Sequence, residues 1–177
     1  MVLFIGFLIK SRMLYDIARQ YFSPLGYKTV DIDRMHMTIL FIGDPPSITR
    51  SQIIKAIREK IIGPPMYIVL KVRGLGLLPP DKCTHIVVFV EPPKEVYEFR
   101  HKLAEVVSRF YEIRDRYNFI PHITVAHRLK RPRQNVLERL LAMLKKAEQK
   151  LPSRIPVYKP VAIETVRGNY IVYELFS

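Results

Sequence analysis

Two short motifs in this sequence combine a histidine with a threonine two residues later. The first is His36-Met37-Thr38 and the second is His122-Ile123-Thr124. Both lie in apolar runs, and residues two apart in a β-strand point to the same face of the sheet. Each motif is therefore expected to present its histidine and threonine together, with the intervening apolar residue turned into a core.

Two histidines offered in this way suit acid–base catalysis at phosphorus. Imidazole titrates near neutral pH, so one ring can accept a proton while the other donates one. Displacement at a phosphodiester needs these roles on opposite sides of the phosphorus atom. A threonine hydroxyl beside each ring can donate a hydrogen bond to a non-bridging oxygen, where charge develops in the transition state. We predict His36 and His122 as catalytic residues and Thr38 and Thr124 as phosphate-binding residues, with no metal or other cofactor.

The repetition of the motif carries this argument, because a single His-x-Thr is usually a structural feature of a strand. With five histidines in the chain, chance would give two such matches on the order of one time in a hundred. Other uses of histidine fit less well. The sequence has no His-Glu-x-x-His segment and no cysteine pair for zinc, no Gly-x-Ser-x-Gly elbow and no Walker-type phosphate loop.

Apolar periodicity predicts the elements that must position the motifs. Besides the motif strands, we expect strands at 2–9, 27–30, 67–72, 84–90, 157–166 and 170–176. Helical spacing predicts helices that begin after Ser11, after Thr49 and near Val96 and Val136. The segment 74–80 holds two glycines and two prolines and is expected to be a turn or loop.

The arrangement of these elements predicts the fold class. Short connections favour an α+β fold with mainly antiparallel sheets over a doubly wound parallel sheet. The motifs lie nearly half of the 177-residue chain apart, and each is followed by a helix. We therefore expect an internal duplication, with the two lobes packed as one unit over residues 1–177 and the motifs meeting at a pseudo-symmetric cleft.

Composition narrows the partners and the compartment. The net charge of +13 favours a polyanionic partner, chiefly nucleic acid. The lone Cys83 cannot form an internal disulfide, which favours a reducing cytoplasm. The apolar segment 1–10 lacks the features of a signal peptide, and no other stretch approaches the roughly 20 apolar residues of a membrane span. We expect a cytoplasmic protein with no membrane partner.

The paired motifs resemble those of the 2H phosphoesterase superfamily, and most closely its RNA 2′,3′-cyclic phosphodiesterases, historically called 2′-5′ RNA ligases. The resemblance rests on residues 36–43 and 121–126, and the N-terminal apolar strand and residues 72–76 support it. It implies a bilobal, pseudo-two-fold fold in which two mainly antiparallel sheets, flanked by helices, surround a central cleft. It also implies hydrolysis of RNA 2′,3′-cyclic phosphate ends to 2′-phosphates without a metal, and in some members reversible 2′-5′ ligation of tRNA halves.

The second motif departs from the family in one place. The family often continues with Ala-Arg, its arginine lying near the phosphate, whereas this chain has His127 followed by Arg128. On a regular strand Arg128 shares the face of His122 and Thr124. Either Arg128 takes over the phosphate contact or the contact is missing.

Further candidates for RNA contacts come from basic and aromatic residues near the motifs. They are Arg34, Tyr117, Phe119, Lys130 and Arg131. His85 and His101 are expected to be structural or surface residues. As a working assignment His122 is the base and His36 the acid, since the symmetry of the motifs does not distinguish them.

The expected partner is RNA with a 2′,3′-cyclic phosphate terminus, tRNA halves among the candidates, bound by a monomer. Two alternatives stay open. One is a non-catalytic RNA-binding module of the same fold. The other is a phosphodiesterase of small cyclic nucleotides or 2′-5′ oligoadenylates.

Overall fold

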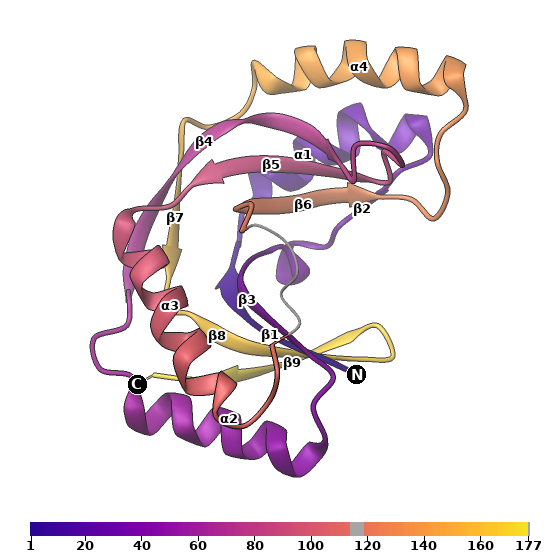
Figure 1. Ribbon diagram of the computed structural model, residues 1–177. Coiled ribbons are helices and arrows are strands. Elements are labelled where there is room, and N and C mark those ends of the chain that lie inside the picture. Colours follow the sequence, from indigo (N-terminus) through magenta and orange to yellow (C-terminus); the bar gives the residue numbers. More distant parts are fainter. Residues whose placement is uncertain (114–118, 177) are drawn as a thin grey trace.

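A computed structural model describes residues 1–113 and 119–176 of the chain (Figure 1). The described residues form two antiparallel sheets whose concave faces look toward each other, with helices on the outer sides. This arrangement confirms the predicted α+β, bilobal fold with a central cleft. No helix in the described part of the chain is long and apolar enough to cross a membrane.

The first sheet has four strands in the order β3-β1-β8-β9. Its strands are β1 (Val2–Leu8), β3 (His36–Gly43), β8 (Val161–Val166) and β9 (Asn169–Glu174). The β8–β9 hairpin comes from the far end of the chain and completes the sheet beside β1. Alternate residues of β1, namely Leu3, Ile5 and Phe7, are fully buried in the main core. The opposite face of the same strand is turned toward the cleft.

The second sheet has five strands in the order β2-β6-β5-β4-β7. Its strands are β2 (Lys28–Thr29), β4 (Tyr67–Leu78), β5 (His85–Glu91), β6 (His122–His127) and β7 (Arg154–Tyr158). The predicted strand 157–166 was therefore wrong in part, because its two ends belong to different sheets. Residues 159 and 160, Lys and Pro, separate them.

The loop expected at 74–80 was also wrong, because β4 continues through it to Leu78. The register with β5 shifts between Val72 and Gly74, and Gly74 has φ 143°, so a glycine permits an irregularity inside a long strand. A Cβ on Gly76 would lie 2.3 Å from the Phe89 ring. Gly76 thus permits close packing within the sheet, and Gly74 permits the close approach of the Glu148 carboxylate; neither forms a turn.

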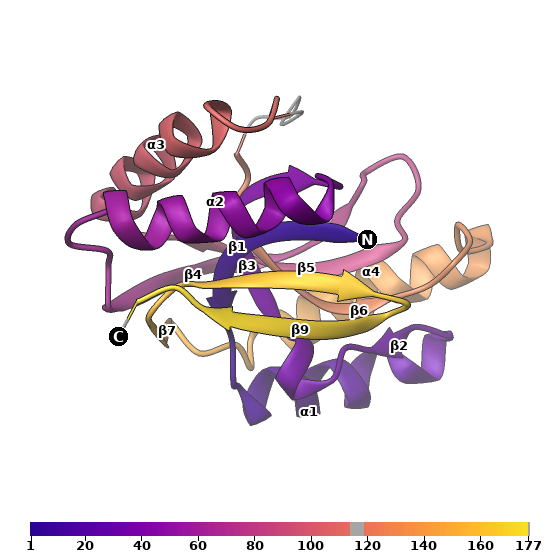
Figure 2. The ribbon, with the colours of Figure 1, turned by 90° about the horizontal axis from the view of Figure 1, so that it is seen from below.

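Four helices cover the outer faces of the sheets in the described residues. They are α1 (Arg12–Tyr21), α2 (Ser47–Lys60), α3 (Lys94–Ser108) and α4 (Gln134–Glu148), with two short 3₁₀ turns, η1 (Ser23–Leu25) and η2 (Ile32–Arg34). Ser11 caps α1 as predicted, its side chain accepting from the Leu14 amide. The start expected after Thr49 was wrong, because α2 begins at Ser47. Figure 2 shows α2 and α3 side by side, above the β8–β9 hairpin in that view.

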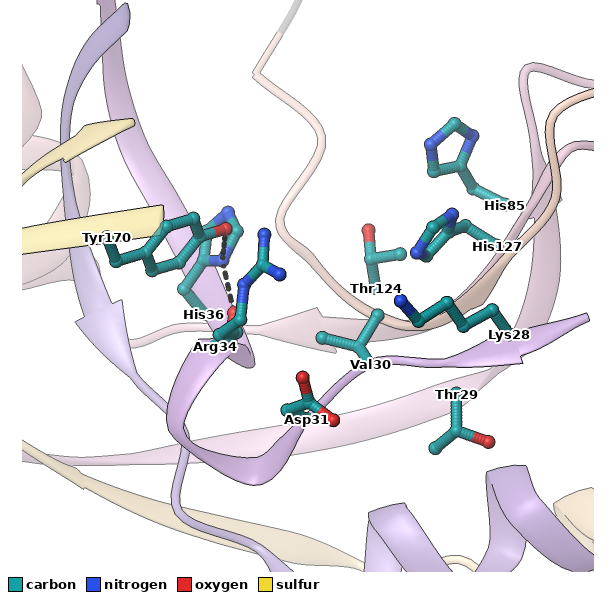
Figure 3. Close-up of a pocket in the computed structure, with 10 residues that line it drawn as sticks. All are labelled: Lys28, Thr29, Val30, Asp31, Arg34, His36, His85, Thr124, His127 and Tyr170. Carbon is teal, nitrogen blue, oxygen red and sulfur yellow. Dashed lines mark hydrogen bonds between the residues drawn. The ribbon is translucent and has the colours of Figure 1, made fainter. Parts of the chain in front are cut away.

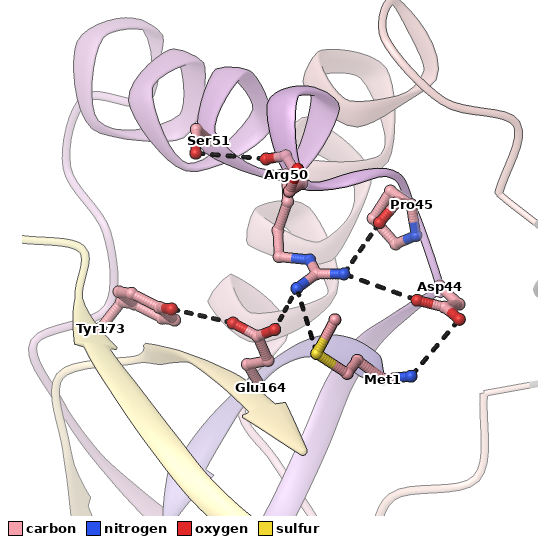
Figure 4. Close-up of polar contacts among 8 residues, drawn as sticks. Met1, Asp44, Pro45, Arg50, Ser51, Glu164 and Tyr173 are labelled. Atoms are coloured by element: carbon pink, nitrogen blue, oxygen red, sulfur yellow. Dashed lines mark hydrogen bonds and ion pairs between the residues drawn. The ribbon is translucent and has the colours of Figure 1, made fainter. Parts of the chain in front are cut away.

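A polar cluster is buried between α2 and the four-stranded sheet (Figure 4). The Arg50 guanidinium forms an ion pair with Glu164 of β8 and donates to the Pro45 carbonyl at 2.9 Å. The Tyr173 hydroxyl of β9 donates to the other oxygen of Glu164 at 2.8 Å. These contacts fasten the C-terminal hairpin to the N-terminal half of the chain.

Candidate active site

The two His/Thr motifs meet where the two sheets approach each other. His36 is the first residue of β3 and His122 is the first residue of β6, and these two strands contact each other across the cleft. The two histidines and the two threonines are all half-buried. The structure therefore brings together the four residues that the sequence predicts as a single site.

Both histidines make the same hydrogen bond through Nδ1. His36 Nδ1 lies 2.9 Å from the Arg34 carbonyl oxygen, and His122 Nδ1 lies 2.7 Å from the Ile120 carbonyl oxygen. A carbonyl only accepts, so Nδ1 carries a proton in each ring. Nε2 is then the atom that exchanges a proton with a bound molecule. The bond is formed in both lobes with the residue two positions earlier.

Gly6 of β1 sets the position of β3. Gly6 pairs with Thr38, and a Cβ at Gly6 would lie 2.5 Å from the Met37 carbonyl oxygen. The register between β1 and β3 shifts between Ile5 and Gly6. A side chain at Gly6 would displace the backbone between His36 and Thr38, so this close approach fixes where the first motif lies.

Two aromatic rings enclose His36. The Phe4 and Tyr170 ring centroids lie 4.7 Å and 5.6 Å from that of His36, and the Tyr170 hydroxyl oxygen lies 3.3 Å from its Nδ1. The Arg34 guanidinium lies over the Tyr170 ring, 4.9 Å from its centroid. Burial lowers the pKa of His36, and the charges of His122 and Arg34 lower it further, against the opposing effect of its hydrogen bond to the Arg34 backbone. Burial therefore disfavours the charged form of the His36 ring.

Tyr170 was not predicted from the sequence. It lies on β9, more than 130 residues beyond His36, and no motif marks it. Only the dipeptide Gly168-Asn169, a hairpin-turn signal in the sequence, pointed to a hairpin at this place, and the turn itself is formed by Arg167 and Gly168. Burial raises the pKa of the Tyr170 hydroxyl, opposed by the nearby Arg34 charge.

A cavity of about 290 Å³ extends from His36 across Thr124 to the far side of the cleft (Figure 3). Its lining residues are Lys28, Thr29, Val30, Asp31, Arg34, His36, His85, Thr124, His127 and Tyr170. Figure 3 shows Arg34, His36 and Tyr170 gathered on one side of Thr124, and Lys28, His85 and His127 on the other. Thr38 and His122 are half-buried beside this cavity and do not line it.

A bulge in β6 decides which residue follows the second motif into the cavity. Val87 of β5 pairs with Thr124, whereas Ile86 pairs with Ala126, so Val125 is an extra residue in β6. The alternation of faces changes at that point, and His127 lies in the cavity with Thr124.

The expectation that Arg128 shares the face of His122 was therefore wrong, because β6 is not a regular strand. The Arg128 guanidinium instead lies over the Tyr27 ring, 5.2 Å from its centroid, and donates to the Leu25 carbonyl at 3.4 Å.

The remaining candidates are placed as follows. Arg34 lines the cavity, whereas Phe119 packs edge-on against Tyr97 and under the Arg100 guanidinium. Lys130 and Arg131 are exposed. Tyr117 lies outside the described residues.

Two further histidines were expected to be structural or surface residues. His101 is exposed and lies 3.4 Å from Glu105. His85 is exposed and lines the cavity, which the sequence did not indicate. A strand register that places His85 beside His127 would have been needed to find it.

Comparison with known proteins identifies the family to which this chain belongs. The model of the 2′-5′ RNA ligase superfamily matches residues 16–158, a range that contains both motifs. The chain belongs to the 2′-5′ RNA ligase superfamily. Membership of this superfamily of 2H phosphoesterases supports an activity on phosphodiester bonds. No curated protein matches the chain.

Solved structures share the fold of this superfamily member at low identity. TT0787 of Thermus thermophilus is 19% identical over 98% of this chain and 96% of that one, with a TM-score of 0.69. Escherichia coli LigT in complex with 3′-AMP is 16% identical over 97% and 93%, with a TM-score of 0.61. ATU0111 from Agrobacterium tumefaciens str. C58, a conserved protein of unknown function, is 16% identical over 97% and 83%, with a TM-score of 0.70.

Proposed function

We propose that this protein is a phosphodiesterase that opens the 2′,3′-cyclic phosphate at the end of an RNA strand to a 2′-phosphate. The observation that carries the proposal is the identical Nδ1 hydrogen bond on His36 and His122. It leaves two Nε2 atoms, one from each lobe, to exchange protons at one substrate. The net charge of +13 favours a polyanion such as RNA.

The reaction follows from two proton transfers on opposite sides of the phosphorus atom. Nε2 of one histidine takes a proton from water as its oxygen attacks phosphorus. The bond between phosphorus and the ribose 3′ oxygen breaks, and Nε2 of the other histidine gives that oxygen a proton. The products are a 2′-phosphate and a free 3′-hydroxyl. Positioned proton transfer of this kind contributes about 10²–10⁴-fold to a rate.

The threonines and Arg34 would hold the phosphate during this step. Thr38 and Thr124 each share a strand face with a catalytic histidine, and their hydroxyls can donate to the two non-bridging oxygens. Arg34 brings a positive charge to the cavity wall beside His36. Solved structures of Escherichia coli LigT include complexes with 3′-AMP and with phosphate, ligands that carry the group proposed for this cleft.

The pKa of His36 bears on which histidine is the base. Burial lowers it, which favours the neutral ring, the form that can accept a proton. This favours His36 as the base and His122 as the acid, the reverse of the assignment made from the sequence.

The same displacement can also join two RNA ends. A 5′-hydroxyl of a second RNA can take the place of water and attack the cyclic phosphate, which releases the 3′ oxygen and forms a 2′-5′ bond. The proposal therefore includes 2′-5′ ligation of RNA ends, tRNA halves among the candidates, by a monomer in the cytoplasm.

The proposal is tested with an RNA oligonucleotide that ends in a 2′,3′-cyclic phosphate, incubated in EDTA. We expect conversion to a 2′-phosphate, and a loss of at least about 10²-fold in His36→Ala and in His122→Ala. His101→Ala, which changes an exposed histidine of α3, serves as the control. Near-full activity in either folded motif variant would contradict the mechanism.

Two other outcomes of the same assay identify the alternatives. Tight binding of the oligonucleotide with unchanged ends would show an RNA-binding module. Turnover restricted to small cyclic nucleotides or 2′-5′ oligoadenylates would show a different substrate class for the same chemistry.

A further inference from the structure

We infer that Lys28, His85 and His127 form a second phosphate subsite, which binds the phosphodiester on the 5′ side of the terminal nucleotide. The inference rests on the proposed function, because it takes the cyclic phosphate to lie between the two motif histidines. It adds a reason why the protein would prefer the end of an RNA strand to a free cyclic mononucleotide.

The three side chains stand in a row across neighbouring strands. Lys28 of β2 and His85 of β5 both pair with His127 of β6, which lies between them. Residues directly opposite each other in neighbouring strands project from the same face of a sheet. Figure 3 shows the three side chains together at the end of the cavity away from His36.

The permanent positive charge of this row is that of Lys28. Among the described residues, neither Lys28 nor Arg34, which lies on the other side of Thr124, has a carboxylate within ion-pairing distance. Asp31 is the one acidic residue in the lining of the cavity, against Lys28, Arg34 and three histidines. Unpaired donors of this kind, projecting from one face into a concave site, suit a phosphate, which has acceptor oxygens for all of them.

The two imidazoles are held in comparable orientations. Their planes differ by 26° and their centroids lie 6.3 Å apart. The Thr84 hydroxyl lies 3.0 Å from His85 Nδ1, and Thr84 itself is buried. This contact restrains the orientation of the His85 ring. Burial lowers the pKa of His127, as do the positive charges of His85, Lys28 and Arg34. A bound anion opposes these effects and favours the charged ring.

A second pocket offers a path out of the cleft for the rest of a bound RNA strand. It has a volume of about 610 Å³ and shares Lys28 and His127 with the first cavity. Arg128 and Lys130 also line it. An RNA strand whose terminal nucleotide occupies the first cavity would thus pass the row of three donors and continue toward these two cations.

The subsite is tested with two substrates that differ in a single phosphodiester. One is adenosine 2′,3′-cyclic phosphate. The other is the same nucleotide with a methyl phosphodiester at its 5′ position, and this added group stays singly charged from pH 6 to pH 8. The readout is the ratio of kcat/KM for the second substrate to that for the first. We expect a ratio of about 10 or more at pH 6, and a smaller ratio at pH 8.

The pH dependence follows from the groups that face His127. They are Lys28 from β2, His85 from β5, and Arg34 and Asp31 from the segment before β3. His127 itself has a pKa lowered from its ordinary value, so the charge that a bound anion favours on this ring is lost as the pH rises.

Three variants and a control separate this role from a structural one. His127→Gln and Lys28→Met should bring the ratio toward 1. His127→Arg should keep the ratio high and weaken its dependence on pH, because its charge is permanent. Lys102→Met, which removes an exposed charge from α3, should leave the ratio unchanged.

A wild-type ratio near 1, or a high ratio that survives both Lys28→Met and His127→Gln, would overturn the subsite while leaving the hydrolysis in place. If neither substrate is hydrolysed, and an RNA oligonucleotide with a 2′,3′-cyclic phosphate end is not hydrolysed either, the proposed function fails. Calorimetric titration with adenosine 2′-phosphate and with its 5′-methylphosphate derivative then tests the subsite. The ratio of the two affinities should show the same preference for the derivative, and the same response to the variants, as expected for kcat/KM.

Discussion

The substitution Gly6→Ala tests how the first motif is positioned. The added Cβ would lie 2.5 Å from the Met37 carbonyl oxygen, whereas ordinary van der Waals contact begins near 3.4 Å. The neighbour is backbone, which has no rotamer to change, so β1 and β3 must separate by roughly 0.5 to 0.9 Å. Met37 lies between His36 and Thr38, so this displacement moves both functional side chains.

The size of the effect follows from the displacement. A misplacement of about 1 Å at an active site can cost about 10²-fold in rate. We therefore expect Gly6→Ala to lower kcat/KM about 10- to 100-fold on an RNA with a cyclic phosphate end. Overpacking should also lower the free energy of unfolding by about 1–3 kcal/mol, so activity must be measured where the variant is fully folded.

A second glycine supplies the control for that loss of stability. Gly63 has φ +68° and nothing within 4 Å of an added Cβ. Gly63→Ala should cost about 1–2 kcal/mol through backbone strain, with kcat/KM unchanged. The reasoning is refuted if Gly6→Ala folds and retains wild-type kcat/KM, or if both alanine variants lose activity in proportion to their loss of stability.

Three further predictions concern the surroundings of the site. Tyr170→Phe should lower kcat about 3- to 10-fold, because it removes the hydroxyl 3.3 Å from His36 Nδ1 but keeps the ring; unchanged kcat would count against a role for the hydroxyl. Burial depresses the pKa of His36 from 6.5, so its neutral form stabilises the fold above that pH, and stability should fall as the pH drops below 6.5. Urea titrations at pH 7.5 and 5.5 should show a smaller difference in His36→Gln than in the wild type. Arg50→Met should lower the free energy of unfolding by about 3–5 kcal/mol, because Glu164 stays buried without its partner; the double variant with Glu164→Leu should recover most of that loss in denaturant titrations.

The meeting of the two His/Thr motifs could be predicted because their signal is local and repeated. Alternation in a short strand is enough to place His36 with Thr38 and His122 with Thr124, and the repetition distinguishes the motif from a core histidine. The structure adds the Nδ1 hydrogen bonds, which depend on the carbonyl groups of Arg34 and Ile120. Apolar periodicity likewise predicted most of the helices and strands.

The rest of the site depends on contacts that the sequence does not display. Tyr170 reaches His36 only because β8 pairs with β1, a pairing between opposite ends of the chain. His127 enters the cavity, and Arg128 leaves it, because one extra residue, Val125, changes the faces of β6. Such a bulge reflects the pairing of β6 with β5, which single-sequence periodicity does not reveal.

The central claim is that His36 and His122 perform opposite proton transfers on one phosphodiester. It is tested most directly with a cyclic phosphate in which sulfur replaces the bridging 3′ oxygen. Thiolate leaves without a proton because a thiol has a pKa near 8.5, so this substrate should restore the rate of the acid variant alone.

We expect the sulfur substrate to restore His122→Ala to within about tenfold of the wild-type rate, and to leave His36→Ala impaired by at least about 10²-fold. Rescue of His36→Ala instead would exchange the two roles. Rescue of both variants, or of neither, would contradict the account.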